Sequence, residues 1–229
     1  MAEPRIVSHE EWLKARTAFM AKEKEFTRLR DELARERRAL PWERVEKDYV
    51  FEAPEGRTTL ANLFGGKSQL VVYHFMFGPD YAEGCPSCSF WADNYNGVGV
   101  HLAARDTALV AVSRAPLSRF APYKQRMGWT FRWVSSAGSD FNYDYGVSRR
   151  PGDKLLDYNY GTLQRDADEH PGISTFVRQG DAVFHTYSTF ARGLDPMNAS
   201  YQLLDLTAHG RQEEGLPFPM AWVRRHDRY

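Results

Sequence analysis

The feature that most constrains the fold is a Cys-x-x-Cys motif between an apolar run and a segment that can be helical. Cys85 and Cys88 are the only two cysteines in the chain. The run 70–77 before them is nearly all apolar, as expected of a central strand covered on both faces. The segment from 89 to about 104 can form a helix. A strand, a loop, Cys-x-x-Cys and a helix form the context in which this motif indicates redox chemistry.

The motif also assigns different tasks to its two thiols. We expect Cys85 at the N-cap of the helix, with Pro86 at the first helical position, where its missing N–H is no loss. A free thiol titrates at about pH 8.5 and reacts as the thiolate, which unpaired amides and the helix dipole favour. Cys88 follows one turn later and can attack a mixed disulfide. Cys85 is therefore the predicted nucleophile and Cys88 the resolving thiol.

Two other interpretations of the pair stay open. The cysteines can be inert small residues under a loop, or they can bind a metal. A zinc site needs two more ligands, and His101 has no second His or Cys at a suitable spacing. A metal held by His74 and both cysteines is a further alternative. We predict no metal, and no organic cofactor either, because no G-x-G-x-x-G motif follows a strand.

Several other residues are candidates for supporting roles. His74 lies inside the apolar run, and a hydrogen-bonded core histidine is favoured there over an acid–base group. Trp91, one turn into the helix, is expected in the core rather than as a platform for substrate. The stretch 137–171 is rich in Gly, Asp, Asn and Tyr and shows no period, as in a functional or mobile loop. The candidates for a substrate cleft are Tyr143, Tyr145 and Arg192.

The N-terminal segment predicts one long amphipathic helix. Ser8 and Glu11 have the spacing of a capping box, and no Gly or Pro follows until Pro41. Apolar residues recur every seven positions and form a narrow stripe. We expect this stripe to pack either on its own domain or against a second subunit in a homodimer. Its members are Trp12, Phe19, Phe26, Leu33 and Leu40.

The remaining pattern reads strand, helix, strand, helix, strand, long loop, β-hairpin and helix. Buried strands are expected at 70–77 and 107–113, a short third strand at 130–135, a helix at 116–127, and a hairpin at 173–187. The predicted organisation is a helical extension (1–44), one domain (45–210, with an insertion at about 137–171) and a polar tail (211–229).

Composition narrows the possible partners. The 229 residues carry no formal net charge, so nothing directs the chain to nucleic acid or to an anionic membrane. No apolar stretch reaches the roughly 18 residues of a transmembrane helix, and the N-terminus does not resemble a secretory signal. We therefore expect a cytoplasmic protein with neither a nucleic-acid nor a membrane partner. In a reducing compartment, paired cysteines favour catalysis or metal binding over a structural disulfide.

Five short segments of the sequence are distinctive, namely 40–42, 72–79, 84–89, 187–193 and 204–207. They resemble the DUF899 family, a group of thioredoxin-like predicted dithiol-disulfide oxidoreductases. The resemblance covers nearly the whole chain. It implies a thioredoxin-like α/β fold, with a central mixed sheet flanked by helices, a long N-terminal helix and an insertion before the terminal hairpin.

Two positions depart from better-understood relatives. Thioredoxin-like proteins usually carry a cis-proline facing the cysteines, but Ser174 occupies the matching position here, so we expect a trans bond. On this reading Ser174 approaches the cysteines from the opposite loop. The chain is also similar to peroxiredoxins at 77–80 and 145–147. However, the spacing from Pro79 to Cys85 is one residue short, and Ala82 stands where the peroxide-binding Thr or Ser would be.

The sequence thus predicts thiol–disulfide exchange with a disulfide or thiol substrate, either a protein or a small molecule. The alternative from another class is a non-catalytic thioredoxin-like binding or scaffold protein that uses the aromatic loop as its contact surface. A peroxiredoxin-like peroxidase is the third interpretation.

Overall fold

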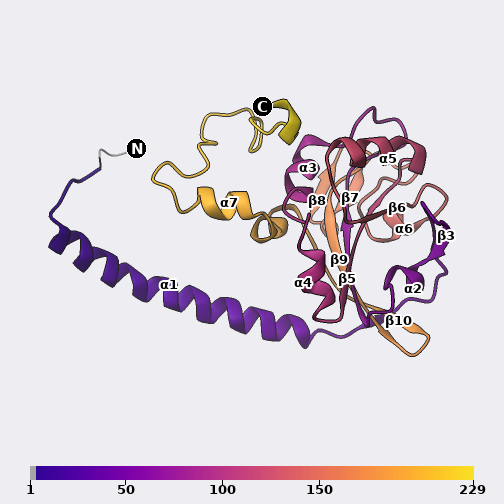
Figure 1. Ribbon diagram of the computed structural model, residues 1–229, viewed down its shortest axis with the longest axis horizontal. Helices are drawn as coiled ribbons and strands as arrows, with labels where there is room; N and C mark the ends of the chain where they lie inside the picture. The colour runs from indigo at the N-terminus through magenta and orange to yellow at the C-terminus, as the bar shows by residue number, and fades with distance from the viewer. Residues whose placement is uncertain (1–3) are drawn as a thin grey trace. The chain divides into compact units, whose positions relative to one another are not determined.

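The computed structural model describes residues 4–229, and its two compact units are Met1–Pro41 and Trp42–Tyr229 (Figure 1). The first three residues of the predicted 1–44 extension lie outside the described part. The boundary falls next to Pro41, which cannot continue a helix. No helix within residues 4–229 has the length and apolar character needed to cross a membrane.

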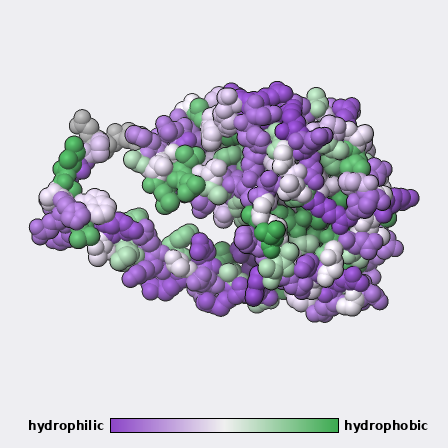
Figure 2. Space-filling model, viewed as in Figure 1, coloured by the Kyte–Doolittle hydropathy of each residue, from purple (hydrophilic) through white to green (hydrophobic). Residues whose placement is uncertain are grey.

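The first unit contains helix α1 (His9–Arg38). Its predicted capping box is confirmed: the Glu11 N–H donates to Ser8 Oγ at 3.3 Å, and the Ser8 N–H donates to the Glu11 carboxylate at 3.2 Å. No residue of α1 is buried. Figure 2 shows mainly hydrophilic residues along it, with hydrophobic ones between them. The five apolar residues at seven-residue spacing are 46–65% exposed.

The second unit contains an eight-stranded mixed sheet in the order β1-β10-β9-β4-β5-β6-β2-β3. Strand β4 is parallel to β5 and antiparallel to β9, and β5 is parallel to β6. This topology confirms the predicted thioredoxin-like fold, with its two buried strands, its short third strand and its hairpin. The strands are β1 (Glu43–Arg44), β2 (Val50–Ala53), β3 (Gly56–Thr59), β4 (Gln69–His74), β5 (Thr107–Ser113), β6 (Arg132–Ser135), β9 (Gly172–Gln179) and β10 (Ala182–Phe190), with β7 (Leu156–Tyr158) and β8 (Leu163–Arg165) forming a separate pair.

Helices cover both faces of the sheet, with α3 and α4 on one side and α2 and α6 on the other (Figure 1). The helix expected from 89 to 104 is in fact two, because Gly97 has a φ of +94° and breaks the segment. The helices of this unit are α2 (Leu60–Leu63), α3 (Pro86–Ala92), α4 (Gly99–Ala103), α5 (Leu117–Arg126), α6 (Phe141–Asp144), α7 (Ala199–Leu204), and the 3-10 segments η1 (Ala191–Met197) and η2 (His226–Arg228).

Two hydrophobic clusters, one on each face of the sheet, form the main core. Side chains alternate between the faces along a strand. Tyr73 of β4 therefore packs in the cluster that contains Cys88, whereas its neighbour Val72 packs in the opposite cluster. This alternation decides which side chains can reach the cysteines.

Residues 211–229, predicted as a polar tail, belong to the second compact unit. Val223 is buried, and Trp222 packs against the cluster that contains Cys88. The polar composition of the segment concealed these apolar anchors.

Candidate active site

The dithiol lies after β4, where α3 begins. Cys85 is the N-cap residue of α3 and Pro86 occupies its first turn, so this predicted placement is confirmed. The Cys85 N–H donates to the Met76 carbonyl at 3.2 Å, which ties the loop back to the chain just beyond β4. Both cysteines are free thiols. Cys85 is partly exposed and Cys88 is buried, so the pair has one accessible and one covered thiol.

The two thiols also differ in acidity. The pKa of Cys85 is lowered to about 6, chiefly because the Cys88 thiol hydrogen-bonds to it. Burial opposes this shift, while the backbone amides of Cys88 and Ser87 and the Arg225 cation favour the thiolate. Burial raises the pKa of Cys88 well above its ordinary value, and the neighbouring Cys85 adds to that effect. The negative charge of the pair therefore resides on Cys85 at neutral pH.

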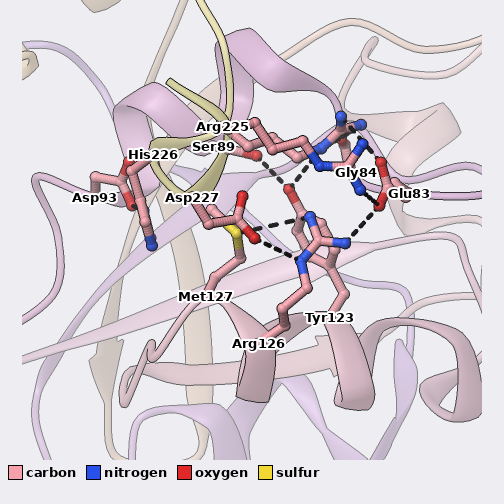
Figure 3. Close-up of polar contacts among 11 residues, drawn as sticks. Glu83, Gly84, Ser89, Asp93, Tyr123, Arg126, Met127, Arg225, His226 and Asp227 are labelled. Carbon is pink, nitrogen blue, oxygen red and sulfur yellow. Dashed lines mark hydrogen bonds and ion pairs between the residues drawn. The ribbon is translucent and has the colours of Figure 1, made fainter.

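Arg225 holds the residue before Cys85. Its Nη2 donates to the Gly84 carbonyl oxygen at 2.8 Å and its Nε donates to the same oxygen at 3.2 Å. Its Nη1 lies 3.0 Å from the Glu83 carboxylate. Figure 3 shows the Arg225 side chain directed towards Gly84 and Glu83. A cation is thus fixed beside the reactive thiol by a residue 141 positions away from Gly84 in the sequence.

Tyr123 of α5 links Arg225 to α3. Ser89 Oγ donates its proton to the Cys85 carbonyl at 2.8 Å, so it accepts from the Tyr123 hydroxyl, 2.7 Å away. The Tyr123 oxygen in turn accepts from Arg225 Nε at 3.2 Å. This chain of three hydrogen bonds fixes the first turn of α3. Figure 3 shows its part from Arg225 through Tyr123 to Ser89.

Gly84 is required by close packing. A Cβ at this position would lie 2.7 Å from the Phe75 ring and 2.8 Å from the Tyr123 ring. The loop therefore approaches these rings more closely than any side chain would allow. Arg225 holds the Gly84 carbonyl oxygen, and the rings of Phe75 and Tyr123 pack against the Gly84 Cα. The backbone that leads to Cys85 is therefore fixed from two sides.

Glu83 is surrounded by arginines. It pairs with Arg126, with Arg225 at 3.0 Å and with Arg228 at 2.7 Å, and Arg126 also pairs with Asp227 at 3.0 Å. We call these five residues the tail clamp. The hydrogen bond from Arg126 is the main cause that holds the pKa of Glu83 below its usual value. The Glu83 charge, which by its position in the sequence would oppose a thiolate at Cys85, is compensated by these cations.

His74 does not lie with the cysteines. Its ring stacks against Phe141 and Tyr145 in the cluster on the opposite face, and its Nε2 is 2.8 Å from Ser174 Oγ. Burial lowers the pKa of His74 to about 3, so it is neutral. The favoured interpretation of a hydrogen-bonded core histidine is confirmed. The metal site of His74 with both cysteines does not assemble, because the sheet separates them.

Ser174 also faces away from the cysteines. It pairs with Val72 of β4 and bonds to Ser188 Oγ at 2.8 Å. The expectation that it approaches Cys85 is wrong, because neighbouring Ile173 occupies the face that contains Cys88. The expected trans bond before Ser174 is confirmed, since no described peptide bond is cis.

The other candidate residues are dispersed. Trp91 is buried and donates to the Leu194 carbonyl at 2.9 Å, as a core residue would. Tyr145 packs on the face opposite the dithiol, against Phe176. Arg192 is exposed and pairs with Asp195 at 3.2 Å. These three residues do not form a common cleft.

Tyr143 does line a cavity, of about 490 Å³. Its ring lies under the Arg114 guanidinium, 4.5 Å from ring centre to the guanidinium carbon. Arg114 also bonds to the buried Glu169 at 3.1 Å, and the pKa of Glu169 is raised to about 7 by burial. The cavity is bounded by the 78–81 segment of the loop that leads to Cys85. Of the predicted cleft residues, only Tyr143 is placed there.

The sequence did not identify the residues that hold the backbone around the dithiol, namely Arg225, Tyr123 and Ser89. Ser89 lies beside the motif and could have been considered from its spacing alone. Arg225 could not, because it stands in a polar segment with no periodicity and is far from Cys85 in the chain.

The sheet order and the position of the dithiol define a thioredoxin-like protein. More particularly, the chain belongs to the DUF899 family, because that family's model, described as "Bacterial protein of unknown function (DUF899)", matches residues 1–229. No curated protein matches the sequence significantly.

Two solved structures with a related fold are peroxiredoxins by name. Peroxidoxin BcpB from Mycobacterium tuberculosis has a TM-score of 0.49 and 16% identity, over 72% of this chain and 97% of its own. Peroxiredoxin Q from Xanthomonas campestris has a TM-score of 0.47 and 13% identity, over 66% and 85%. Values this low do not transfer an activity.

Proposed function

We propose that this protein is a thiol–disulfide oxidoreductase in which Cys85 attacks and Cys88 resolves. The observation that carries the proposal is the asymmetry of the pair. Cys85 is partly exposed and has a pKa of about 6, while Cys88 is buried, retains its proton and hydrogen-bonds to Cys85. This is the division of tasks that exchange through a mixed disulfide requires.

The reaction follows from this arrangement. The Cys85 thiolate attacks one sulfur of a substrate disulfide, forms a mixed disulfide and releases the other substrate sulfur as a thiolate. Cys88 then loses its proton and attacks the Cys85 sulfur, which releases the second substrate thiolate and leaves a Cys85–Cys88 disulfide. The substrate gains two electrons and the protein loses two. A dithiol reductant restores the starting state by the reverse exchange.

The surroundings of Cys85 support the first step. Arg225 places a cation beside the thiolate, and its bonds to Gly84 and Tyr123 fix the backbone on either side of the sulfur. A thiol with a pKa near ambient pH combines a high thiolate fraction with retained nucleophilicity. Arg225 thus acts through Cys85 as a positioning residue.

The proposal is tested by reduction of a model disulfide, such as a dithiobis-nitrobenzoate or an insulin disulfide, with dithiothreitol as the final reductant. Wild-type protein is expected to turn over, and Cys85→Ser to fall to the background rate. Alkylation of Cys85 is expected to be half-maximal near pH 6. Alkylation that is half-maximal at the pH of an ordinary thiol, together with no turnover, would instead favour the binding or scaffold interpretation.

Peroxide reduction is the second candidate, because the same acidic, partly exposed thiol suits it. The Cys85 thiolate would attack the peroxide oxygen, giving a sulfenic acid and an alcohol or water. Cys88 would then condense with the sulfenic acid and release water. Ala82 offers no hydroxyl for the peroxide. Peroxide consumption faster than disulfide turnover, measured on the same preparation, would reverse the order of the two candidates.

A further inference from the structure

Helix α1 carries a complete set of positions for pairing with a second copy of itself. The strict seven-residue repeat of Trp12, Phe19, Phe26 and Leu33 places these residues at the a positions of a heptad, and Leu40 continues the spacing just beyond the end of α1. The d positions are then Ala15, Lys22, Leu29 and Glu36. The a residues and Leu29 are about half exposed or more. A stripe with this strict repeat stays at the contact between two helices when they wind into a left-handed supercoil.

The charges that flank the stripe specify how the partner lies. In a parallel coiled coil, each g residue faces the e residue five positions later on the other helix. The g–e′ pairs here are Glu11 with Arg16, Ala18 with Glu23, Glu25 with Arg30, and Glu32 with Arg37. Three of the four pairs are attractive and none is repulsive. From this charge complementarity we propose that α1 forms a parallel, in-register, two-stranded coiled coil with α1 of a second copy of this chain.

The antiparallel alternative is opposed by the same residues. In an antiparallel pair, g faces g and e faces e. The charged g residues are all glutamates, and three of the four e residues are arginines, so like charges would meet. The intrahelical pair of Arg16 with Glu23, at 2.7 Å, links two e positions of one helix and leaves this argument unchanged.

Two d positions limit the strength of the pairing. In the parallel register, Lys22 meets Lys22 and Glu36 meets Glu36 of the second copy. A lysine keeps its head in water by extending its stem along the apolar seam. These two layers favour a weak, reversible dimer.

The test uses full-length protein and reverses the charges of one flank at a time. Glu25→Lys with Glu32→Lys, and separately Arg30→Glu with Arg37→Glu, turn attractive g–e′ pairs into repulsive ones. Sedimentation equilibrium is expected to show a wild-type dimer and a dissociation constant raised about tenfold or more in each double variant. An equimolar mixture of the two variants restores the attraction and is expected to form a heterodimer. The matched control, Lys24→Glu with Arg38→Glu, changes the same charge at f positions and is expected to leave the dimer intact.

Orientation is tested by cross-linking. Ala15→Cys, in a Cys85→Ser/Cys88→Ser background, brings two identical d positions together only in the parallel register. Oxidation is expected to give a disulfide-linked dimer, while the f-position control Thr17→Cys in the same background stays unlinked. A monomeric wild type, a dimer that resists both charge reversals, or no link at Ala15→Cys would each overturn the proposal. Disulfide turnover is measured separately, so these outcomes do not depend on the proposed reaction.

Discussion

The dithiol site and helix α1 use apolar and charged side chains in opposite ways. Around the dithiol, aromatic rings are buried against one another: Tyr123 meets both Phe77 and Trp129 edge to face. Along α1, the rings of Phe19 and Phe26 remain 55% and 65% exposed. The apolar side chains around the dithiol are packed within one chain. The apolar stripe of α1 is exposed, and its regular repeat suits packing against the same stripe of a second copy.

Charged side chains in the two regions also differ in whether their partners lie in the same chain or in a second copy. In the tail clamp, Glu83 pairs with three arginines of its own chain. On α1, Glu25 and Arg30 are complementary across a parallel seam. Buried or clustered pairs within a chain fix a local geometry, while exposed pairs between chains choose orientation and partner. Substitutions around the dithiol should therefore leave self-association unchanged, and substitutions on α1 should leave the reactivity of the dithiol unchanged.

The largest effect is expected from Cys88→Ser. Without the resolving thiol, the mixed disulfide at Cys85 persists, so multiple turnover stops after about one equivalent of substrate thiol is released. Mass spectrometry of the non-reduced protein should show the trapped adduct. Continued turnover would show that resolution does not need Cys88. The oligomeric state should not change.

Gly84→Ala should reduce stability without touching a catalytic group. The added Cβ would lie 2.7 Å from the Phe75 ring, so the loop or the ring must shift. Overpacking of this kind costs about 1–3 kcal/mol. Urea unfolding measures the change. The control is Gly99→Ala in α4, where a Cβ meets nothing within 4 Å and should be neutral or stabilising. Equal effects at the two glycines would contradict this view of the loop.

Arg225→Gln should raise the pKa of Cys85. Removing the cation destabilises the thiolate relative to the thiol, so the thiolate fraction at pH 6 falls. Alkylation at that pH should slow by about two- to tenfold and recover at alkaline pH. Arg225→Lys keeps the charge and should recover part of the rate. Arg224→Gln, next in the chain, is the control. An unchanged pH profile in Arg225→Gln would remove Arg225 from the site.

The smallest effect on stability is expected from Phe26→Ala. An exposed side chain outside the folded core changes the free energy of unfolding of the second unit by no more than about 0.5 kcal/mol. The same substitution should weaken self-association. Urea unfolding and sedimentation of one preparation measure both quantities. A large loss of stability would mean that the stripe is packed on its own domain, which was the other expectation from the sequence.

Local patterns of the sequence predicted most of the fold. The capping box at Ser8, the apolar run of β4 and the N-cap at Cys85 are each set by residues within a few positions. The hairpin of β9 and β10 follows from two strand-like runs around Gly180. The break after α3 was missed as a boundary, although Gly97 marked the weak point.

The surroundings of the site were less predictable. Alternation along β4 places His74 and Tyr73 on opposite faces, but no local signal tells which face receives the cysteines. Tyr73 is the residue that reaches them, through a hydrogen bond from its hydroxyl to the Cys88 carbonyl at 3.2 Å. Arg225 depends on a contact over 141 residues, which no periodicity encodes.

The 141-residue separation of Gly84 and Arg225 has a consequence during synthesis of the chain. At about 5–20 residues per second, synthesis from Gly84 to Arg225 takes roughly 7–28 s. Strand β9, the antiparallel neighbour of β4, also emerges late in this interval. Until Arg225 has left the ribosome, Cys85 lacks the cation that favours its thiolate. The full set of groups that stabilise the Cys85 thiolate is therefore assembled only when the second unit is nearly finished.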